Sequence, residues 1–114
     1  MNPGEIYLAD IPYVGTHPVV VVSREELNRG KKVIAVVLTS SKFGIRSQLP
    51  NCVPFRAGQF GLTVDCVAQC ETIAPIPKDA LDWQHGLIGV LSEEALRDVI
   101  RAIGQVIGAS CEPI

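Results

Sequence analysis

The chain has 114 residues, of which 47% are hydrophobic and 5% aromatic, and its formal net charge at pH 7 is −2. A chain of this length forms one domain, expected here over residues 1–114, and buries roughly 65% of its unfolded surface. The composition excludes a disordered chain. The scarcity of aromatic residues argues against base stacking on aromatic platforms, and the slightly negative charge argues against a general nucleic-acid-binding protein.

From the sequence we expect no segment that crosses a membrane or directs export. No apolar run approaches the roughly 20 residues that span a bilayer. The first ten residues, MNPGEIYLAD, lack the basic and apolar regions of a signal peptide. We therefore expect a cytoplasmic protein.

The spacing of the four cysteines matches no zinc-binding pattern. Two of them, Cys66 and Cys70, are expected on one strand, which would separate their Cα atoms by about 13 Å, too far for a disulfide. We expect mostly buried, reduced thiols and no cofactor. The cysteines are Cys52, Cys66, Cys70 and Cys111.

The basic residues are concentrated in one segment. Between Arg24 and Arg56 lie seven of the ten lysines and arginines and only two acids, Glu25 and Glu26, which gives +5 in this segment and −7 in the rest. Such an asymmetry is typical of an anion-binding face. Solvated loop charges explain it equally well, and the sequence leaves both interpretations open.

The first half of the chain predicts three strands. Alternation in Glu5–Ile11 indicates a first strand, and Pro12–Thr16 a turn. The apolar runs Pro18–Val22 and Val33–Leu38 are rich in β-branched residues, and because they lack polar alternation we expect both of their faces to be covered. Between them, Arg24–Gly30 has room for one helical turn.

The middle of the chain predicts a loop and two further strands. Ser41–Pro50 is polar and contains glycine, so we expect a mobile loop. Cys52–Phe55 is expected to be a short edge strand because it contains a proline. Leu62–Ile73 predicts another strand, which Ala74–Pro77 is expected to end.

The C-terminal third predicts a helix. Lys78–Trp83 suits a helical turn, and His85–Leu91 a last short strand. Ser92 is expected to cap a helix with one apolar face, and Cys111–Ile114 to be frayed. The apolar positions of this helix are Leu96, Val99, Ile100, Ile103, Val106 and Ile107. Together these elements predict a mainly β fold, a small and strongly bent sheet or barrel covered by a C-terminal helix.

Polar side chains on the strand Leu62–Ile73 suggest a site. Alternation puts Asp65, Gln69 and Glu71 on the face opposite Cys66 and its buried neighbours. Three polar residues on one face of a central strand need solvent, partners or a function. A solvated sheet face and a functional site both fit this pattern.

Two histidines and a pair of hydroxyl residues complete the candidates. His17 precedes a proline, which favours extended backbone and puts it at the mouth of a strand. Its imidazole can exchange a proton near neutral pH, although a lone histidine is more often structural than catalytic. His85 is expected to pack in a loop. Thr39 and Ser40 end a strand, where hydroxyls cap backbone groups or donate to a phosphate.

Five segments of the sequence resemble one known family. No hydrolase elbow, phosphate-binding loop or H-E-x-x-H motif is present. The order and spacing of the segments agree with the MazF/PemK (Kid-like) toxins of toxin–antitoxin systems from about Gly4 to Val106. The segments are GEIYLADIP, HPVVVVS, LNRGKKVIAVVLTS, VPFRAGQFGLTVDCVAQCETI and LIGVLSEEALRDVIRAI.

This resemblance implies an SH3-like barrel with a C-terminal helix, a symmetric homodimer and a metal-independent endoribonuclease. Members of the family cut single-stranded RNA at short sequences. They are neutralised by an antitoxin whose disordered, acidic tail covers the RNA groove. The implied chemistry is attack by a ribose 2′-hydroxyl on the adjacent phosphate, which needs a base, an acid and groups that stabilise the phosphorane.

The resemblance also carries residues over, with departures. The family arginine before the Pro-Val-Val strand matches His17, and the threonine that ends the next strand matches Thr39. One branch of the family has an Arg-x-Asp pair on the later strand; its arginine matches Gln69 here and its aspartate matches Glu71. A further arginine of the family falls at Ala74. Losing one preorganised donor typically costs about 10²–10³ in rate.

Our working hypothesis is that His17 and Glu71 form the acid–base pair. Thr39, Ser40 and Gln69 are then expected to hold phosphate or sugar oxygens. The residues expected to steer RNA are Arg24, Arg29, Lys42 and Arg46.

Two other functions stay open. Because three arginine positions are replaced, the fold can be a catalytically silent SH3-like module that binds RNA, an antitoxin or another protein without cleavage. A gyrase-directed toxin on the related barrel is the third alternative. Cleavage of naked RNA by the purified protein separates these alternatives from the ribonuclease.

Overall fold

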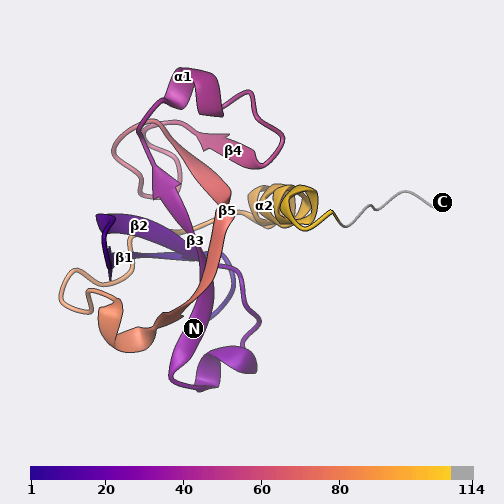
Figure 1. Cartoon of the computed structure of the whole chain (residues 1–114). Coiled ribbons are helices and arrows are strands. Elements are labelled where there is room, and N and C mark those ends of the chain that lie inside the picture. Colours follow the sequence, from indigo (N-terminus) through magenta and orange to yellow (C-terminus); the bar gives the residue numbers. More distant parts are fainter. Residues whose placement is uncertain (109–114) are drawn as a thin grey trace.

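The structure is a computed structural model that describes residues 1–108, and it consists of one bent antiparallel sheet and a C-terminal helix (Figure 1). The six strands follow the order β4-β5-β3-β2-β1-β6. This confirms the expected mainly β fold with a strongly bent sheet. The strands are β1 (Glu5–Ile11), β2 (Gly15–Val21), β3 (Lys32–Thr39), β4 (Cys52–Phe55), β5 (Cys66–Pro77) and β6 (Gly89–Val90); the helix is α2 (Glu93–Val106), and three short turns are η1 (Leu27–Arg29), α1 (Phe43–Arg46) and η2 (Lys78–Ala80).

The central strands are buried on both faces, as their unbroken apolar runs predict. On one face, Val20 of β2 and Val36 of β3 pack with α2. On the other, Val19 and Val37 belong to a second apolar cluster with residues of β1 and η2. Two clusters on one sheet explain why β2 and β3 show no polar alternation.

The helix α2 covers β5 and β4 (Figure 1). Its buried residues are Ala95, Val99 and Ala102. The strand β5 presents Cys66, Ala68 and Cys70 to the same cluster, which confirms the alternation expected for that strand. Among the residues that the structure describes, no helix is long and apolar enough to cross a membrane.

The strand β5 begins and ends later than the sequence suggests. The sequence predicts a strand over Leu62–Ile73 that ends in Ala74–Pro77, but β5 spans Cys66–Pro77. Only its first four residues pair with β4; the next residue, Cys70, donates its N–H to the Asn51 carbonyl at 3.0 Å, and from there on β3 is the only strand that pairs with β5 in the described residues. Prolines are tolerated along such an unpaired edge because no neighbouring carbonyl needs their missing N–H group.

Two further predictions of secondary structure are wrong in extent. The segment Ser41–Pro50, expected to be a loop, contains the helical turn α1, in which the Arg46 N–H donates to the Lys42 carbonyl at 2.9 Å. The expected strand His85–Leu91 is reduced to the two residues of β6, which pair with β1. The predicted fraying of Cys111–Ile114 lies outside the described residues.

Three cysteines are free and buried, as expected: Cys52, Cys66 and Cys70. Burial raises the pKa of the Cys66 thiol to about 11, with a smaller contribution from the charge of Asp65. Burial likewise raises the pKa of Cys70 to about 12. These thiols are therefore protonated at neutral pH and are poor nucleophiles.

The start of α2 supplies a first prediction. The Ser92 hydroxyl accepts a hydrogen bond from the Ala95 N–H at 3.1 Å, which satisfies one of the free amides at the helix N-terminus. We expect Ser92→Ala to lower the free energy of unfolding by about 1 kcal/mol in urea denaturation. Ser92→Asp keeps an acceptor and should unfold like the wild type; equal destabilisation by both variants would contradict the capping role.

Candidate functional site

The candidate site forms where the pairing between β3 and β5 is interrupted. Val37 lies opposite Gln69, but Ala35 lies opposite Ala74, so the four residues 70–73 of β5 stand against one residue of β3. A bulge of this kind bends a strand and redirects its side chains. The interruption therefore separates the first part of β5, which pairs with β4, from its proline-containing end.

One threonine closes the gap in the hydrogen-bond ladder. The Val37 N–H donates to the Thr72 hydroxyl oxygen at 2.9 Å. The same hydroxyl donates to the Gln69 carbonyl at 2.6 Å. Thr72 thus replaces the missing strand partner and fixes the backbone of Val37 and Gln69 relative to each other. Sequence reasoning missed this residue because a single hydroxyl inside a strand carries no pattern.

A pocket of about 500 Å³ opens beside this interruption. It brings together His17 from β2, Thr39 from β3 and Gln69 from β5, three side chains that the sequence singles out. Arg46 reaches it from α1. The lining residues are Ile11, Val14, His17, Val37, Thr39, Ser41, Arg46, Gln69 and Thr72.

The strand register explains why these side chains meet. Val19 pairs with Val37, and Val37 with Gln69, so these three positions form one row across the sheet. His17 and Thr39 each lie two residues from that row and therefore point to the same face. This is the face of the second apolar cluster, opposite α2.

The hydroxyl of Thr39 lies in a nearly buried position. Thr39 is 7% exposed, and its hydroxyl oxygen accepts a hydrogen bond from the Ser41 N–H at 3.2 Å. Ser40 is exposed beside it. The end of β3 is therefore capped by its own hydroxyl, and Thr39 keeps its O–H hydrogen available as a donor.

Glu71 does not line the pocket but is tied to it through Gln69. The Gln69 amide Nε2 donates to Glu71 Oε2 at 3.1 Å, and the Asn51 Nδ2 donates to Oε1 at 2.9 Å. Burial raises the pKa of Glu71, but hydrogen bonds from Gln69, its own backbone and Asn51, with the charge of Arg46, outweigh this and lower it below its ordinary value. Glu71 is therefore ionised at neutral pH.

The basic residues divide between two regions. Arg46 lines the pocket, where its guanidinium donates to the Ser41 carbonyl at 3.2 Å, and Lys42 begins the same helical turn. Arg24 follows the opposite end of β2 from His17, roughly 20 Å away along an extended chain, and pairs with Glu26. Arg29 ends η1, the helical turn that follows Arg24 in the chain. The basic segment therefore does not form a single face at this pocket.

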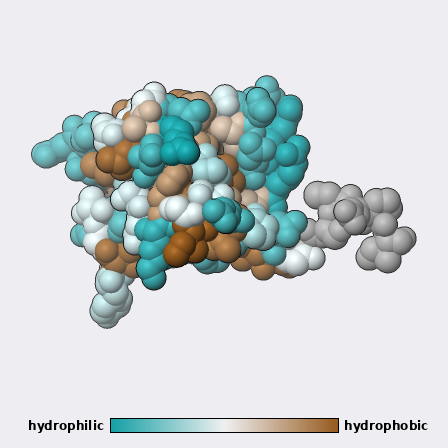
Figure 2. Space-filling view, turned by 90° about the horizontal axis from the view of Figure 1, so that it is seen from above, coloured by the Kyte–Doolittle hydropathy of each residue, from teal (hydrophilic) through white to brown (hydrophobic). Residues whose placement is uncertain are grey.

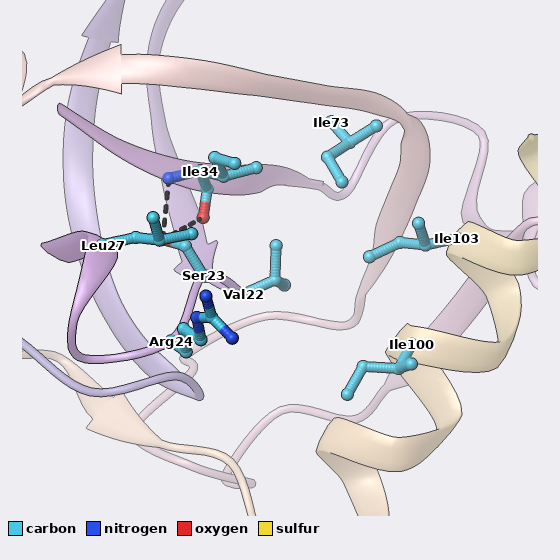
Figure 3. Close-up of a pocket in the computed structure, with 8 residues that line it drawn as sticks. All are labelled: Val22, Ser23, Arg24, Leu27, Ile34, Ile73, Ile100 and Ile103. Carbon is cyan, nitrogen blue, oxygen red and sulfur yellow. Dashed lines mark hydrogen bonds between the residues drawn. The ribbon is translucent and has the colours of Figure 1, made fainter.

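A second hollow, of about 360 Å³, lies between η1 and α2 (Figure 3). Its wall is apolar: Leu27 and Ile34 lie on one side, and Ile100 and Ile103 of α2 on the other. The Ser23 hydroxyl at its base accepts from the Ile34 N–H at 2.9 Å. Exposed apolar residues also occur elsewhere on the surface: Figure 2 shows them interspersed among polar residues on one face of the molecule. This hollow offers contact surface rather than chemistry.

Residues 2–107 match the family of PemK-like, MazF-like toxins of type II toxin–antitoxin systems. The chain belongs to this family. The match covers nearly the whole chain and confirms the resemblance found in the five sequence segments. No curated protein sequence matches the chain.

Solved structures of MazF proteins have the same fold. A mycobacterial endoribonuclease in complex with its cognate antitoxin is 24% identical, with a TM-score of 0.78 over 98% of this chain and 99% of that one. The Mycobacterium tuberculosis toxin MazF-mt6 is 22% identical, with a TM-score of 0.77 over 93% and 98%. A MazE–MazF complex from Deinococcus radiodurans is 15% identical, with a TM-score of 0.71 over 96% and 97%.

The bridge made by Thr72 supplies a second prediction. Thr72→Val keeps the shape of the side chain but leaves the Val37 N–H without its partner, so we expect the free energy of unfolding to fall by about 1–3 kcal/mol. Thr72→Ser keeps the hydroxyl and should lose much less. Urea denaturation of both variants measures this difference, and equal losses would show that the hydroxyl is dispensable.

Proposed function

We propose that this toxin is an endoribonuclease that cleaves single-stranded RNA at short sequences without a metal ion. The observation that supports this most is the pocket that joins His17, Thr39, Gln69 and Arg46 in a member of the MazF-like family. It offers a proton-exchanging imidazole, a hydroxyl, an amide and a cation within one hollow. RNA as the substrate implies action in the cytoplasm.

The proposed reaction is attack of a ribose 2′-oxygen on the neighbouring phosphorus. The bond from phosphorus to the 5′-oxygen breaks, leaving a 2′,3′-cyclic phosphate and a 5′-hydroxyl end. The 2′-hydroxyl proton passes to a base, and the leaving 5′-oxygen takes a proton from an acid. We assign this proton transfer to His17, which lines the pocket: its imidazole takes the 2′-hydroxyl proton and passes it to the leaving 5′-oxygen. Glu71, predicted from the sequence as the acid–base partner of His17, lies outside the pocket, and we assign it to hold the amide of Gln69.

The remaining residues serve binding. The Thr39 hydroxyl, with Ser40 beside it, is suited to hold phosphate or sugar oxygens, and the Arg46 guanidinium offsets charge on the phosphorane. Lys42 lies on the same turn and extends the positive charge toward the RNA. Arg24 and Arg29 stay predicted contacts for RNA that continues beyond the pocket.

Substitution of the two histidines tests this proposal. In EDTA, the wild type should cut a long, unstructured RNA and leave 5′-hydroxyl ends. His17→Ala should slow cleavage about 100-fold or more with an unchanged circular dichroism spectrum, because it removes the proton-transfer group. His85→Ala, which alters an exposed histidine outside the pocket, should cut like the wild type.

Full activity of His17→Ala would overturn the assignment of His17. A folded wild-type protein that binds RNA without cutting it would instead support the second candidate, a catalytically silent binding module. The observation that favours this module is the replacement of three family arginines at His17, Gln69 and Ala74. Such a module is expected to bind RNA without cleaving it.

We further propose two protein partners. The first is an antitoxin with an acidic tail, in line with the solved complexes of this fold with antitoxins. Arg46 and Lys42 supply positive charge for such a tail at the pocket. The second is another copy of the chain, for which the apolar hollow in Figure 3 is the proposed contact surface.

The exposed apolar residues of this hollow make dimerisation testable. Ile100 is 52% exposed and Leu27 54%, an unfavourable arrangement unless a partner covers them. We expect light scattering to give the mass of a dimer for the wild type and of a monomer for Ile100→Asp. Val90→Asp, also at an exposed apolar position but outside the hollow, is the control. A wild-type monomer at all concentrations would contradict this proposal.

A further inference from the structure

The side-chain amide of Gln69 has a fixed direction. A carboxylate that is ionised only accepts hydrogen bonds, so the amide must turn its NH₂ end to Glu71, as the 3.1 Å contact from Nε2 to Oε2 shows. The other carboxylate oxygen accepts from Asn51 at 2.9 Å, which holds the carboxylate itself in place. The Gln69 carbonyl oxygen, Oε1, is therefore directed away from Glu71.

This oxygen is an acceptor without a partner in the described part of the chain. Within residues 1–108, Oε1 of Gln69 receives no hydrogen bond, and Gln69 is only partly buried along the wall of the pocket. The Thr72 hydroxyl binds the backbone carbonyl of Gln69 and so anchors the residue from a second side. An anchored residue with one free acceptor is preorganised for a ligand that donates a hydrogen bond.

We propose that Gln69 uses this oxygen to select a nucleotide that carries an N–H or O–H donor beside the scissile phosphate. Glu71 and Asn51 act as positioning residues that keep the amide from turning over. This inference rests on the proposed function, and it attributes part of the sequence preference of RNA cleavage to Gln69. The donor belongs either to the edge of a base or to a ribose 2′-hydroxyl.

The chemistry excludes a phosphate contact for this oxygen. An amide carbonyl carries partial negative charge and donates nothing, so it repels phosphate oxygens. The family resemblance suggests an arginine for this position. A guanidinium only donates hydrogen bonds, so an arginine here would bind phosphate oxygens, which the Gln69 oxygen repels. Gln69, expected from the sequence to hold phosphate or sugar oxygens, is therefore assigned in this proposal to a donor group on the sugar or on a base.

The decisive experiment compares cut sites in a randomised single-stranded RNA library. Gln69→Met keeps the length of the side chain but offers no acceptor, so one position beside the cut should lose a preference of about 3- to 10-fold. Glu71→Gln should reduce the same preference, because the amide of Gln69 is then free to turn. Gln105→Met, on the exposed side of α2, should keep the wild-type profile.

A second arm of the experiment identifies the donor. If the donor is on a base, the lost preference is for base identity. If the donor is a ribose hydroxyl, wild-type cleavage falls when the nucleotide on the 3′ side of the cut, whose 2′-hydroxyl is not the nucleophile, is made 2′-deoxy, and Gln69→Met is insensitive to this change. Unchanged base profile and unchanged 2′-deoxy sensitivity in both Gln69→Met and Glu71→Gln would overturn the proposal.

The failure of this inference is distinguishable from failure of the proposed function. If the wild type does not cut RNA, the proposed function fails, and the same library is partitioned by binding to the protein. A binding preference that Gln69→Met loses still supports the role of Gln69. A preference identical in wild type and Gln69→Met contradicts it.

Discussion

The hydrogen bond from the Val37 N–H to the Thr72 hydroxyl is the contact on which the candidate site depends. At this point β5 contains extra residues, and the regular ladder between β3 and β5 cannot continue. A buried N–H without a partner costs about 1–3 kcal/mol, so the sheet tolerates the interruption only because a side chain supplies the acceptor. The same hydroxyl holds the Gln69 carbonyl, so one residue both repairs the sheet and positions a pocket residue.

The rest of the site follows from this arrangement. Val19, Val37 and their neighbours are buried in one apolar cluster with residues of β1 and η2, so the sheet behind the pocket is tightly packed. The polar groups lie beside this apolar surface, Thr39 at the end of β3 and Gln69 at the interruption of its pairing with β5. Gln69, Glu71 and Asn51 then form a chain of hydrogen bonds from the pocket to the edge strand β4. A rigid wall with oriented polar groups is what a site of phosphoryl chemistry requires.

Much of the fold was predictable because strong local patterns agree with it. Two of these patterns are local in the sequence: the β-branched runs that form β2 and β3, and the Ser92 cap at the start of α2. Local patterns can be recognised without knowledge of tertiary contacts. The errors arose where distant contacts decide. Pro75 and Pro77 fit a strand because their outer edge has no partner, and the helical turn α1 has no long apolar pattern to announce it.

The same distinction applies to the site. His17, Thr39 and Gln69 are recognisable as candidates in separate stretches of the sequence, and the register of three strands brings them together. The contribution of Thr72 and the orientation of Gln69 by Glu71 were not predictable, since both depend on the bulge in β5. Nor does the sequence show that Arg24 and Arg29 lie at the far end of β2 from the pocket.

The most direct test of this account is NMR mapping of bound RNA. A short single-stranded RNA is titrated onto isotope-labelled His17→Ala protein, in which turnover is suppressed, and amide shifts are followed. If RNA binds at the pocket, we expect the largest shift changes at Thr39, Gln69 and Thr72. Changes confined to the apolar hollow of Leu27 and Ile100, or no changes in a folded protein, would contradict it.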